Sequence, residues 1–166
     1  ASMEQERKTR VMEYLDKQNI PYRMLPHTRE AKTCELAAEE RGVPLDEMVK
    51  SILLKDKKGH IVLACLTGEA NLDPKKVKEY LEGYSRLSFA SAEDIINVLG
   101  YEMGSVAPID LKTKIPVVLD IAIQAKDKVN ISSGDPRLGL ELNTEDFIKC
   151  VPKAIFGDIK GDIKRV

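Results

Sequence analysis

Residues 100–108 have the composition of a backbone segment that can present its amide groups to a ligand. The segment reads Gly-Tyr-Glu-Met-Gly-Ser-Val-Ala-Pro. Glycine tolerates positive φ and close approach by other groups, and proline fixes the direction in which the chain leaves. The same pattern also suits a plain turn in which the first glycine ends a helix. The candidate binding residues of this segment are Gly100, Gly104, Ser105 and Pro108.

Lys50 is the side chain best suited to chemistry. It lies in the run Val-Lys-Ser-Ile-Leu-Leu-Lys at 49–55, which predicts a strand with Lys50 on the same face as Ile52 and Leu54. Lysine is seldom buried without a partner. Its ammonium therefore either reaches solvent from the end of the strand or projects into a polar cavity. In a cavity it would hold an anionic or carbonyl group, or stabilise developing negative charge beside the amides near Gly104.

Three further sites are weaker candidates. His27 follows a predicted strand and could act as a general base, although a lone loop histidine is usually only exposed. Cys34 lies near a predicted helix start, which can lower a thiol pKa, but such cysteines more often fill space. Residues 132–134, Ser-Ser-Gly, would line a pocket or form a turn.

The composition limits the classes of function. The chain has 166 residues, of which 32% are charged and 43% hydrophobic, as in a single soluble domain. Three cysteines without a CxxC pair and only two histidines offer little for a disulfide framework, a zinc site or a Ser-His-Asp triad. A cytoplasmic location is expected, because neither a membrane span nor a secretory segment is evident.

The net charge of −1 argues against nucleic-acid binding mainly through phosphates. RNA recognition would then depend on a terminus or on a local basic patch. The lysines that could form such a patch are Lys55, Lys57, Lys58, Lys112 and Lys114.

The order of the predicted elements favours the α+β class. Helices are expected at 4–18, 33–40, 73–81, 91–99 and 143–150, and strands at 20–25, 49–55, 61–66, 87–89, 115–123, 128–131, 138–142 and 154–156. Adjacent hairpins without a regular βαβ rhythm predict one domain with a mixed, mostly antiparallel sheet flanked by helices. The run at 61–66 is apolar on both faces, which places it centrally in the sheet.

The joint order and spacing of these features resemble the YbaK/ProX family, the freestanding relatives of the editing domain inserted in bacterial prolyl-tRNA synthetase. The features are Lys50 within 49–54, the segment 100–108, residues 131–134, residues 140–142 and Asp146. The opening helix and the segments 20–22 and 36–39 also fit. The domain is expected over residues 4–157, with 1–3 a cloning remnant and 158–166 a C-terminal tail.

The resemblance implies a curved, partly barrel-like sheet and hydrolysis of the ester that links a wrong amino acid to tRNA, typically tRNA(Pro). Lys50 would anchor the 3′-terminal nucleotide, and the backbone of Gly104 would orient the aminoacyl carbonyl. Water would attack with help from the substrate's ribose hydroxyl, without a metal or other cofactor. The expected partners are the aminoacyl-tRNA 3′ end and prolyl-tRNA synthetase. The substrate-binding residues would be His27, Thr33, Gly100, Ser105, Pro108, Ser132, Ser133 and Gly134.

Two departures from the family pattern keep an alternative open. The loop at 134–139 reads Gly-Asp-Pro-Arg-Leu-Gly where the family commonly carries Arg-Gly, and His27 and Thr33 stand where it places larger aromatic residues. The alternative is a non-catalytic module of the same fold that binds aminoacyl-tRNA or a synthetase.

Overall fold

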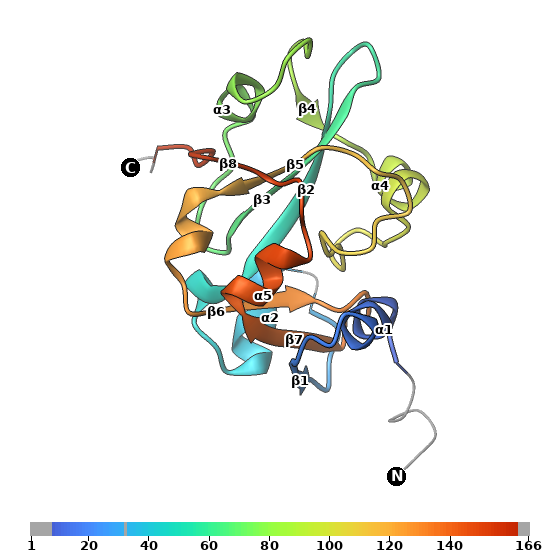
Figure 1. The fold of residues 1–166 in the computed structure, drawn as a ribbon, viewed down its shortest axis with the longest axis vertical. Helices are drawn as coiled ribbons and strands as arrows, with labels where there is room; N and C mark the ends of the chain where they lie inside the picture. The colour runs from blue at the N-terminus through green and yellow to red at the C-terminus, as the bar shows by residue number, and fades with distance from the viewer. Residues whose placement is uncertain (1–7, 32, 163–166) are drawn as a thin grey trace.

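The strands form two sheets rather than one continuous sheet (Figure 1). The computed structural model describes residues 8–31 and 33–162. The sheets have the orders β4-β2-β3-β5-β8 and β1-β7-β6; among the neighbouring strands of the described residues, β3–β5 and β5–β8 pair in parallel and the others antiparallel. The predicted α+β class with mostly antiparallel pairing is confirmed, and in the described residues the strands do not close into a barrel. The strands are β1 (Arg23–Pro26), β2 (Val49–Lys55), β3 (Ile61–Thr67), β4 (Ser88–Phe89), β5 (Val117–Asp120), β6 (Lys128–Ser132), β7 (Leu138–Asn143) and β8 (Ile155–Gly157).

Local capping groups fix the helix boundaries much as the sequence predicts. Thr33 Oγ1 accepts a hydrogen bond from the amide of Leu36, and Ser91 forms a reciprocal capping box with Asp94. None of the described helices is long and apolar enough to cross a membrane. The helices are α1 (Arg10–Lys17), α2 (Cys34–Arg41), α3 (Pro74–Glu79), α4 (Ala92–Leu99) and α5 (Thr144–Lys149), with 3₁₀ helices at Leu45–Glu47 and Ile121–Ala125.

The β2–β3 hairpin is the centre of the larger sheet. β3 is buried from its second residue to its last, as its apolar sequence predicts. The two faces of β2 enter different cores: Val49 and Leu53 join the larger hydrophobic cluster, whereas Ile52 and Leu54 pack in a smaller one. Lys50 therefore starts on the side of the smaller core, at the end of the strand farthest from the hairpin turn.

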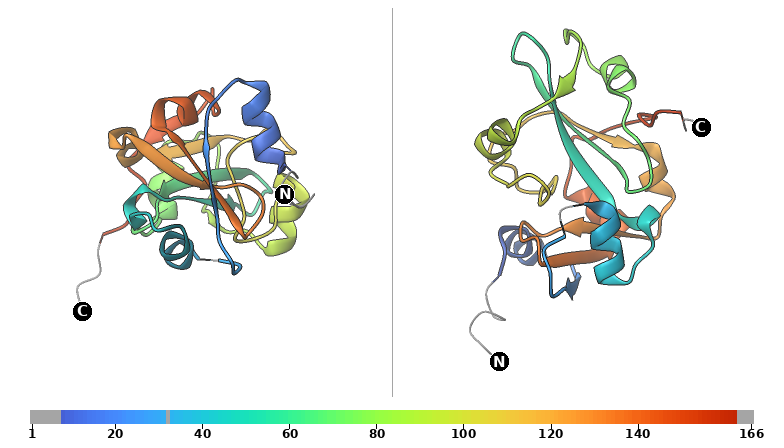
Figure 2. Two further views of the ribbon diagram at one scale, coloured as in Figure 1. Left: turned by 90° about the horizontal axis from the view of Figure 1, so that it is seen from below. Right: turned by 180° about the vertical axis from the view of Figure 1, so that it is seen from behind.

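The two sheets meet beside α2. Met48 forms an isolated parallel bridge with Asn130 of β6, just before β2 begins. Met48 also packs with Ala31, Ala37 and Ala38 in a small apolar cluster. Seen from behind, α2 lies in front of the strands of the three-stranded sheet (Figure 2). This junction brings α2, the start of β2 and the end of β6 together.

Part of the expected C-terminal tail packs against the domain. Ile159 is fully buried, and its amide donates to Asp120 Oδ2 at 3.0 Å. Lys160 forms an isolated bridge with Leu72. Residues 1–3 and the last four residues lie outside the described part of the chain.

The carboxylate of Asp56 ties the β2–β3 turn to the segment before β4. Its side chain has no exposed surface, and it accepts hydrogen bonds from the amides of Lys58, His60 and Ser85, each at 2.9 Å. Burial alone would raise the pKa of this carboxyl, but the hydrogen bonds outweigh burial and hold its pKa below its usual range.

We expect Asp56→Asn to destabilise the protein at neutral pH. Because the folded pKa is lowered, this stabilisation is complete above the unfolded pKa of about 3.9 and is lost as the pH falls toward the folded value. Urea unfolding should give the variant a lower midpoint than wild type at pH 7 and a smaller difference at pH 3. Equal midpoints at pH 7 would contradict this role.

Candidate functional site

One cavity lies where α2, the start of β2, the 100–108 segment and the end of β6 converge. Its volume is about 210 Å³. Four of the predicted site residues line it, namely Lys50, Gly104, Thr33 and Ser132. The structure therefore brings together residues from four segments that are far apart in the sequence.

Lys50 reaches this cavity from the second position of β2. Its side chain is half-buried, and Nζ donates to the carbonyl oxygen of Gly68 at 3.2 Å. Gly68 directly follows β3, the antiparallel neighbour of β2. Of the two placements that the sequence allows, the structure shows the one in which Lys50 lines a cavity. One of its three donors is bound to a neutral carbonyl, so the full positive charge remains for a ligand.

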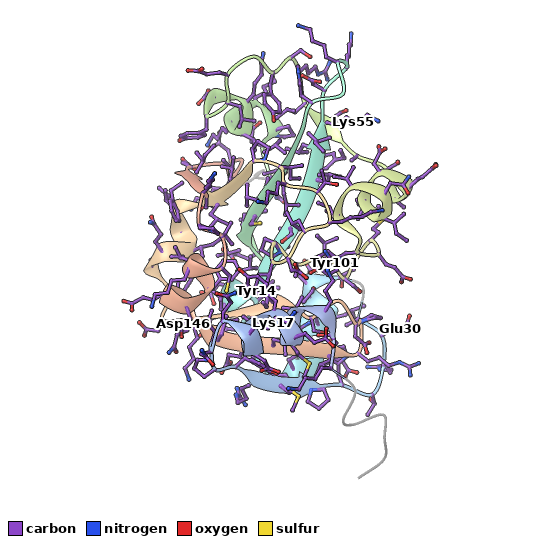
Figure 3. The ribbon with its side chains drawn as sticks, turned by 45° about the vertical axis from the view of Figure 1, so that its right-hand side comes forward. Tyr14, Lys17, Glu30, Lys55, Tyr101 and Asp146 are labelled. Atoms are coloured by element: carbon purple, nitrogen blue, oxygen red, sulfur yellow. The ribbon has the colours of Figure 1, made fainter. Side chains whose placement is uncertain are left out.

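The segment that carries Gly104 is fixed at both ends. The Tyr101 hydroxyl donates to the carbonyl oxygen of Ile109, and the Arg10 guanidinium lies 4.5 Å from the centroid of the Tyr101 ring. Tyr101 accordingly connects the 100–108 segment, to which it belongs, with α1 (Figure 3). Gly104 itself has φ of 89° and is exposed, and the amide of Ser105 donates to Glu102. Because this φ lies in the left-handed region, any residue with a Cβ would be strained at position 104.

Thr33 and Ser132 add polar groups to the lining of the cavity. Thr33 is the N-cap of α2, and Ser132 is the last residue of β6. Cys34, the weaker candidate beside Thr33, also lines the cavity. Burial raises the pKa of its thiol, and the nearby charge of Lys50 offsets only part of that effect. The thiol is therefore neutral at pH 7, a state poorly suited to nucleophilic attack.

Two predicted residues make local bonds outside the cavity lining. His27 Nδ1 lies 2.6 Å from the carbonyl oxygen of Arg29, so Nδ1 carries the proton and donates. The hydroxyl of Ser133 donates to Leu138 O at 2.7 Å and is fully buried. In this structure the Ser133 hydroxyl stabilises the turn between β6 and β7.

The remaining predicted residues shape the backbone around the cavity instead of lining it. Gly100 ends α4 in the left-handed conformation, with φ of 78°, as the turn interpretation of this segment expects. Gly134, with φ of 99°, packs against the ring of Tyr101. Ser105 and Pro108 are buried. In the 100–108 segment, Gly100 thus ends a helix and Pro108 is buried, whereas Gly104 between them is exposed.

Arg41, the last residue of α2, also lines the cavity and was not a candidate from the sequence. Burial lowers the pKa of its guanidinium to about 10. A basic residue in the last turn of a helix is ordinarily explained by the helix dipole, so no local signal marks it. Its position in the cavity depends on packing against distant strands.

The arrangement suits the binding of a carbonyl or anionic group. Among the described lining residues, Lys50 and Arg41 are positively charged and no side chain is acidic. In the part of the chain that the structure describes, no three His, Cys, Asp or Glu side chains gather as metal ligands. Fixed cations and backbone amides in a partly enclosed site stabilise negative charge that develops on oxygen.

The sequence is similar to parts of proline–tRNA ligases and to an uncharacterized protein. It is 28% identical over 134 residues to the proline–tRNA ligase of Bacillus licheniformis, covering 81% of this chain and 23% of the ligase. It is 34% identical over 98 residues to that of Thermosipho africanus, covering 59% of this chain and 17% of the ligase. The chain thus spans less than a quarter of the length of either ligase. The uncharacterized protein YwhH of Bacillus subtilis is 27% identical, with 69% of this chain and 72% of YwhH covered.

Solved structures share the fold. A proposed trans-editing enzyme for prolyl tRNA synthetase superposes with a TM-score of 0.80 at 24% identity, covering 92% of this chain and 96% of that one. A hypothetical protein, APE2540, gives 0.79 at 24% identity, with 90% and 97% covered. The sequence profile of the aminoacyl-tRNA editing domain matches residues 28–150, a span that includes Lys50, Gly104 and the rest of the described cavity. The chain belongs to the aminoacyl-tRNA editing domain family.

Proposed function

We propose that this protein hydrolyses the ester of misacylated aminoacyl-tRNA. The observation that carries the proposal is the meeting of Lys50 and Gly104, from β2 and the 100–108 segment, at one cavity of about 210 Å³. Membership of the editing-domain family supports the substrate class. The cavity offers a fixed cation and an exposed glycine backbone, and groups of this kind stabilise negative charge that develops on a carbonyl oxygen.

The reaction is the addition of water to the aminoacyl carbonyl. The water oxygen bonds to the carbonyl carbon, the bond to the ribose oxygen breaks, and the water's proton passes to that oxygen. The products are a free amino acid and a tRNA with a free 3′ end. Lys50 holds the 3′-terminal nucleotide, the Gly104 backbone orients the carbonyl, and the neighbouring ribose hydroxyl directs the attacking water. Cys34, kept as a neutral thiol, takes no part as nucleophile.

The proposed substrate is a misacylated tRNA(Pro). The similarity to proline–tRNA ligases supports this choice. The cavity walls include Ala31, Ala37 and Val106, and the volume is small. A site of this size excludes large acyl groups, so it sorts substrates by size after the synthetase has charged them. Deacylation assays should use tRNA(Pro), tRNA(Ala) and tRNA(Thr) charged with alanine, serine, threonine or cysteine.

We expect Lys50→Ala to lower kcat/KM for deacylation by roughly tenfold to a hundredfold, because the variant loses a charged hydrogen-bond donor to the terminal nucleotide. Release of labelled amino acid from misacylated tRNA measures the rate. The matched control is Lys78→Ala, which removes an exposed lysine from α3, outside the cavity lining. Circular dichroism should show both variants folded.

Two results would count against the proposal. Full activity in Lys50→Ala would exclude the assigned role of this lysine. Tight binding of misacylated tRNA without release of amino acid from any charged species would favour the non-catalytic binding module instead.

We expect Gly104→Ala to impair deacylation beyond its effect on stability. Alanine at φ of 89° is strained and shifts the backbone that orients the carbonyl. Gly83→Ala is the control, because Gly83 has φ of 80° and open space around its Cα but lies outside the cavity lining. Both variants should lose about 1 kcal/mol of stability, measured by urea unfolding. Equal activity in the two variants would exclude the proposed role of Gly104.

A further inference from the structure

Arg41 supplies a second positive charge to the cavity, and the proposed mechanism gives it no task. Its Nη1 donates to the carbonyl oxygen of Ile131 at 3.2 Å and lies 3.8 Å from Met48 Sδ. The guanidinium also lies directly on Gly139 of β7, where a Cβ would collide with Nε and Cζ. β6, β7 and the residue before β2 therefore hold Arg41 in place from one side, while it faces the cavity with Lys50.

The environment of Arg41 is unfavourable for a cation without a ligand. Its Nε is buried without a hydrogen-bond partner, and in the described residues it forms no ion pair with a carboxylate. Burial lowers the pKa of the group to about 10, which reflects this desolvation. A buried guanidinium usually has an acidic partner because desolvation without one is costly. An acceptor oxygen on a ligand in the cavity would give the guanidinium the partner that no carboxylate of the described residues supplies, although Nε itself is buried against Gly139 and out of reach of a ligand.

We propose that Arg41 is a specificity-determining residue whose guanidinium donates to an acceptor oxygen on the side chain of the acyl group. The cavity then prefers acyl groups that carry such an oxygen, seryl and threonyl, over their apolar isosteres, 2-aminobutyryl and valyl. This inference rests on the proposed function. Lys50 and Gly104 already serve the terminal nucleotide and the reacting carbonyl. The acyl side chain is the part of the substrate left for Arg41, beside the small walls formed by Ala31 and Ala37.

The size of the expected preference follows from the chemistry. A hydrogen bond to a charged group is worth roughly tenfold to a hundredfold in affinity. An apolar pocket of the same shape separates a hydroxyl from a methyl group poorly. Wild type should therefore hydrolyse seryl-tRNA(Pro) with a kcat/KM about tenfold or more above that for 2-aminobutyryl-tRNA(Pro), and threonyl above valyl by a similar ratio.

The test compares these ratios in four proteins, with tRNA(Pro) transcripts charged chemically with each of the four acyl groups. Arg41→Met keeps an unbranched apolar stem but removes the guanidinium with its charge and donors, and should lower both ratios to near one. Gly139→Ala keeps the arginine but displaces its guanidinium, and should therefore also lower both ratios toward one. Arg86→Met removes an exposed arginine outside this cavity and should leave both ratios at the wild-type value.

The outcomes separate this inference from the proposed function. Unchanged ratios in Arg41→Met and Gly139→Ala would show that Arg41 only braces the sheet, and would overturn the inference while deacylation stands. A wild-type preference for the apolar isosteres would overturn it as well. If wild type releases none of the four acyl groups, the proposed function fails. Calorimetry with non-hydrolysable seryl and 2-aminobutyryl amides of 3′-amino-3′-deoxyadenosine then decides: equal affinities overturn the inference, and Arg41-dependent preference for the seryl compound supports it.

If Arg41→Met does not fold, as judged by circular dichroism, Gly139→Ala carries the test alone. The non-helical backbone of Gly139 lies outside the left-handed region, so alanine there strains only the contact with Arg41. Its ratios support or overturn the inference by the same criteria.

Discussion

The register of the β2–β3 pair determines where the cavity lysine points. Lys50 of β2 lies opposite Leu66 of β3, which ends one residue later at Thr67. The next residue, Gly68, therefore lies close to Lys50, and its carbonyl oxygen is 3.2 Å from Lys50 Nζ. A shift of the register by one residue would turn Lys50 toward the large apolar core that Val49 and Leu53 enter. Gly68 cannot be replaced without a collision between the new Cβ and the Leu45 carbonyl. Sheet pairing and one tight glycine contact thus position the cation.

The other half of the site depends on tertiary contacts made by α1. The Tyr101 ring lies under the Arg10 guanidinium, and its hydroxyl closes the 100–108 segment onto Ile109. Arg10 also forms an ion pair with Asp110 at 3.3 Å. These contacts hold the ends of the segment and leave Gly104 exposed at its middle. Packing of α1 against Tyr101, outside the cavity lining, therefore helps to set where the backbone of Gly104 lies.

The parts of the structure that depend on neighbouring residues could be predicted from the sequence. The Thr33 and Ser91 caps, the glycine that ends α4, the β2–β3 hairpin and the central position of β3 follow from local chemistry and apolar pattern. The division into two sheets could not be predicted, because it depends on which strands pair across long stretches of chain. No local pattern distinguishes a pairing of β1 with β7 from a pairing of β1 with β2.

The site was predictable only where residue type alone carries information. Lys50 in an apolar strand and a glycine pair before a proline are unusual in themselves, and Lys50 and the second glycine of that pair, Gly104, line the cavity. His27 and Ser133 are reactive by type, yet their hydrogen bonds are with nearby backbone carbonyls. Arg41 ends a helix as many arginines do. Its contacts with Ile131 and Gly139, 90 or more residues later in the chain, place it in the cavity.

The two cations of the cavity are a feature that selection for folding stability alone would not favour. A chain of net charge −1 places two cations around about 210 Å³ and, among the described residues, lines that space with no acid. Apolar side chains in place of Lys50 and Arg41 would fill the cavity. They would also remove the buried Arg41 Nε, which has no hydrogen-bond partner, and the cost of desolvating two charges. Real proteins depart from such local rules mainly at functional sites. The cavity therefore presents positive charge to a ligand although the chain as a whole has a net charge of −1. Under the proposed function, recognition of an acylated RNA end depends on what enters the cavity more than on attraction to the phosphate backbone.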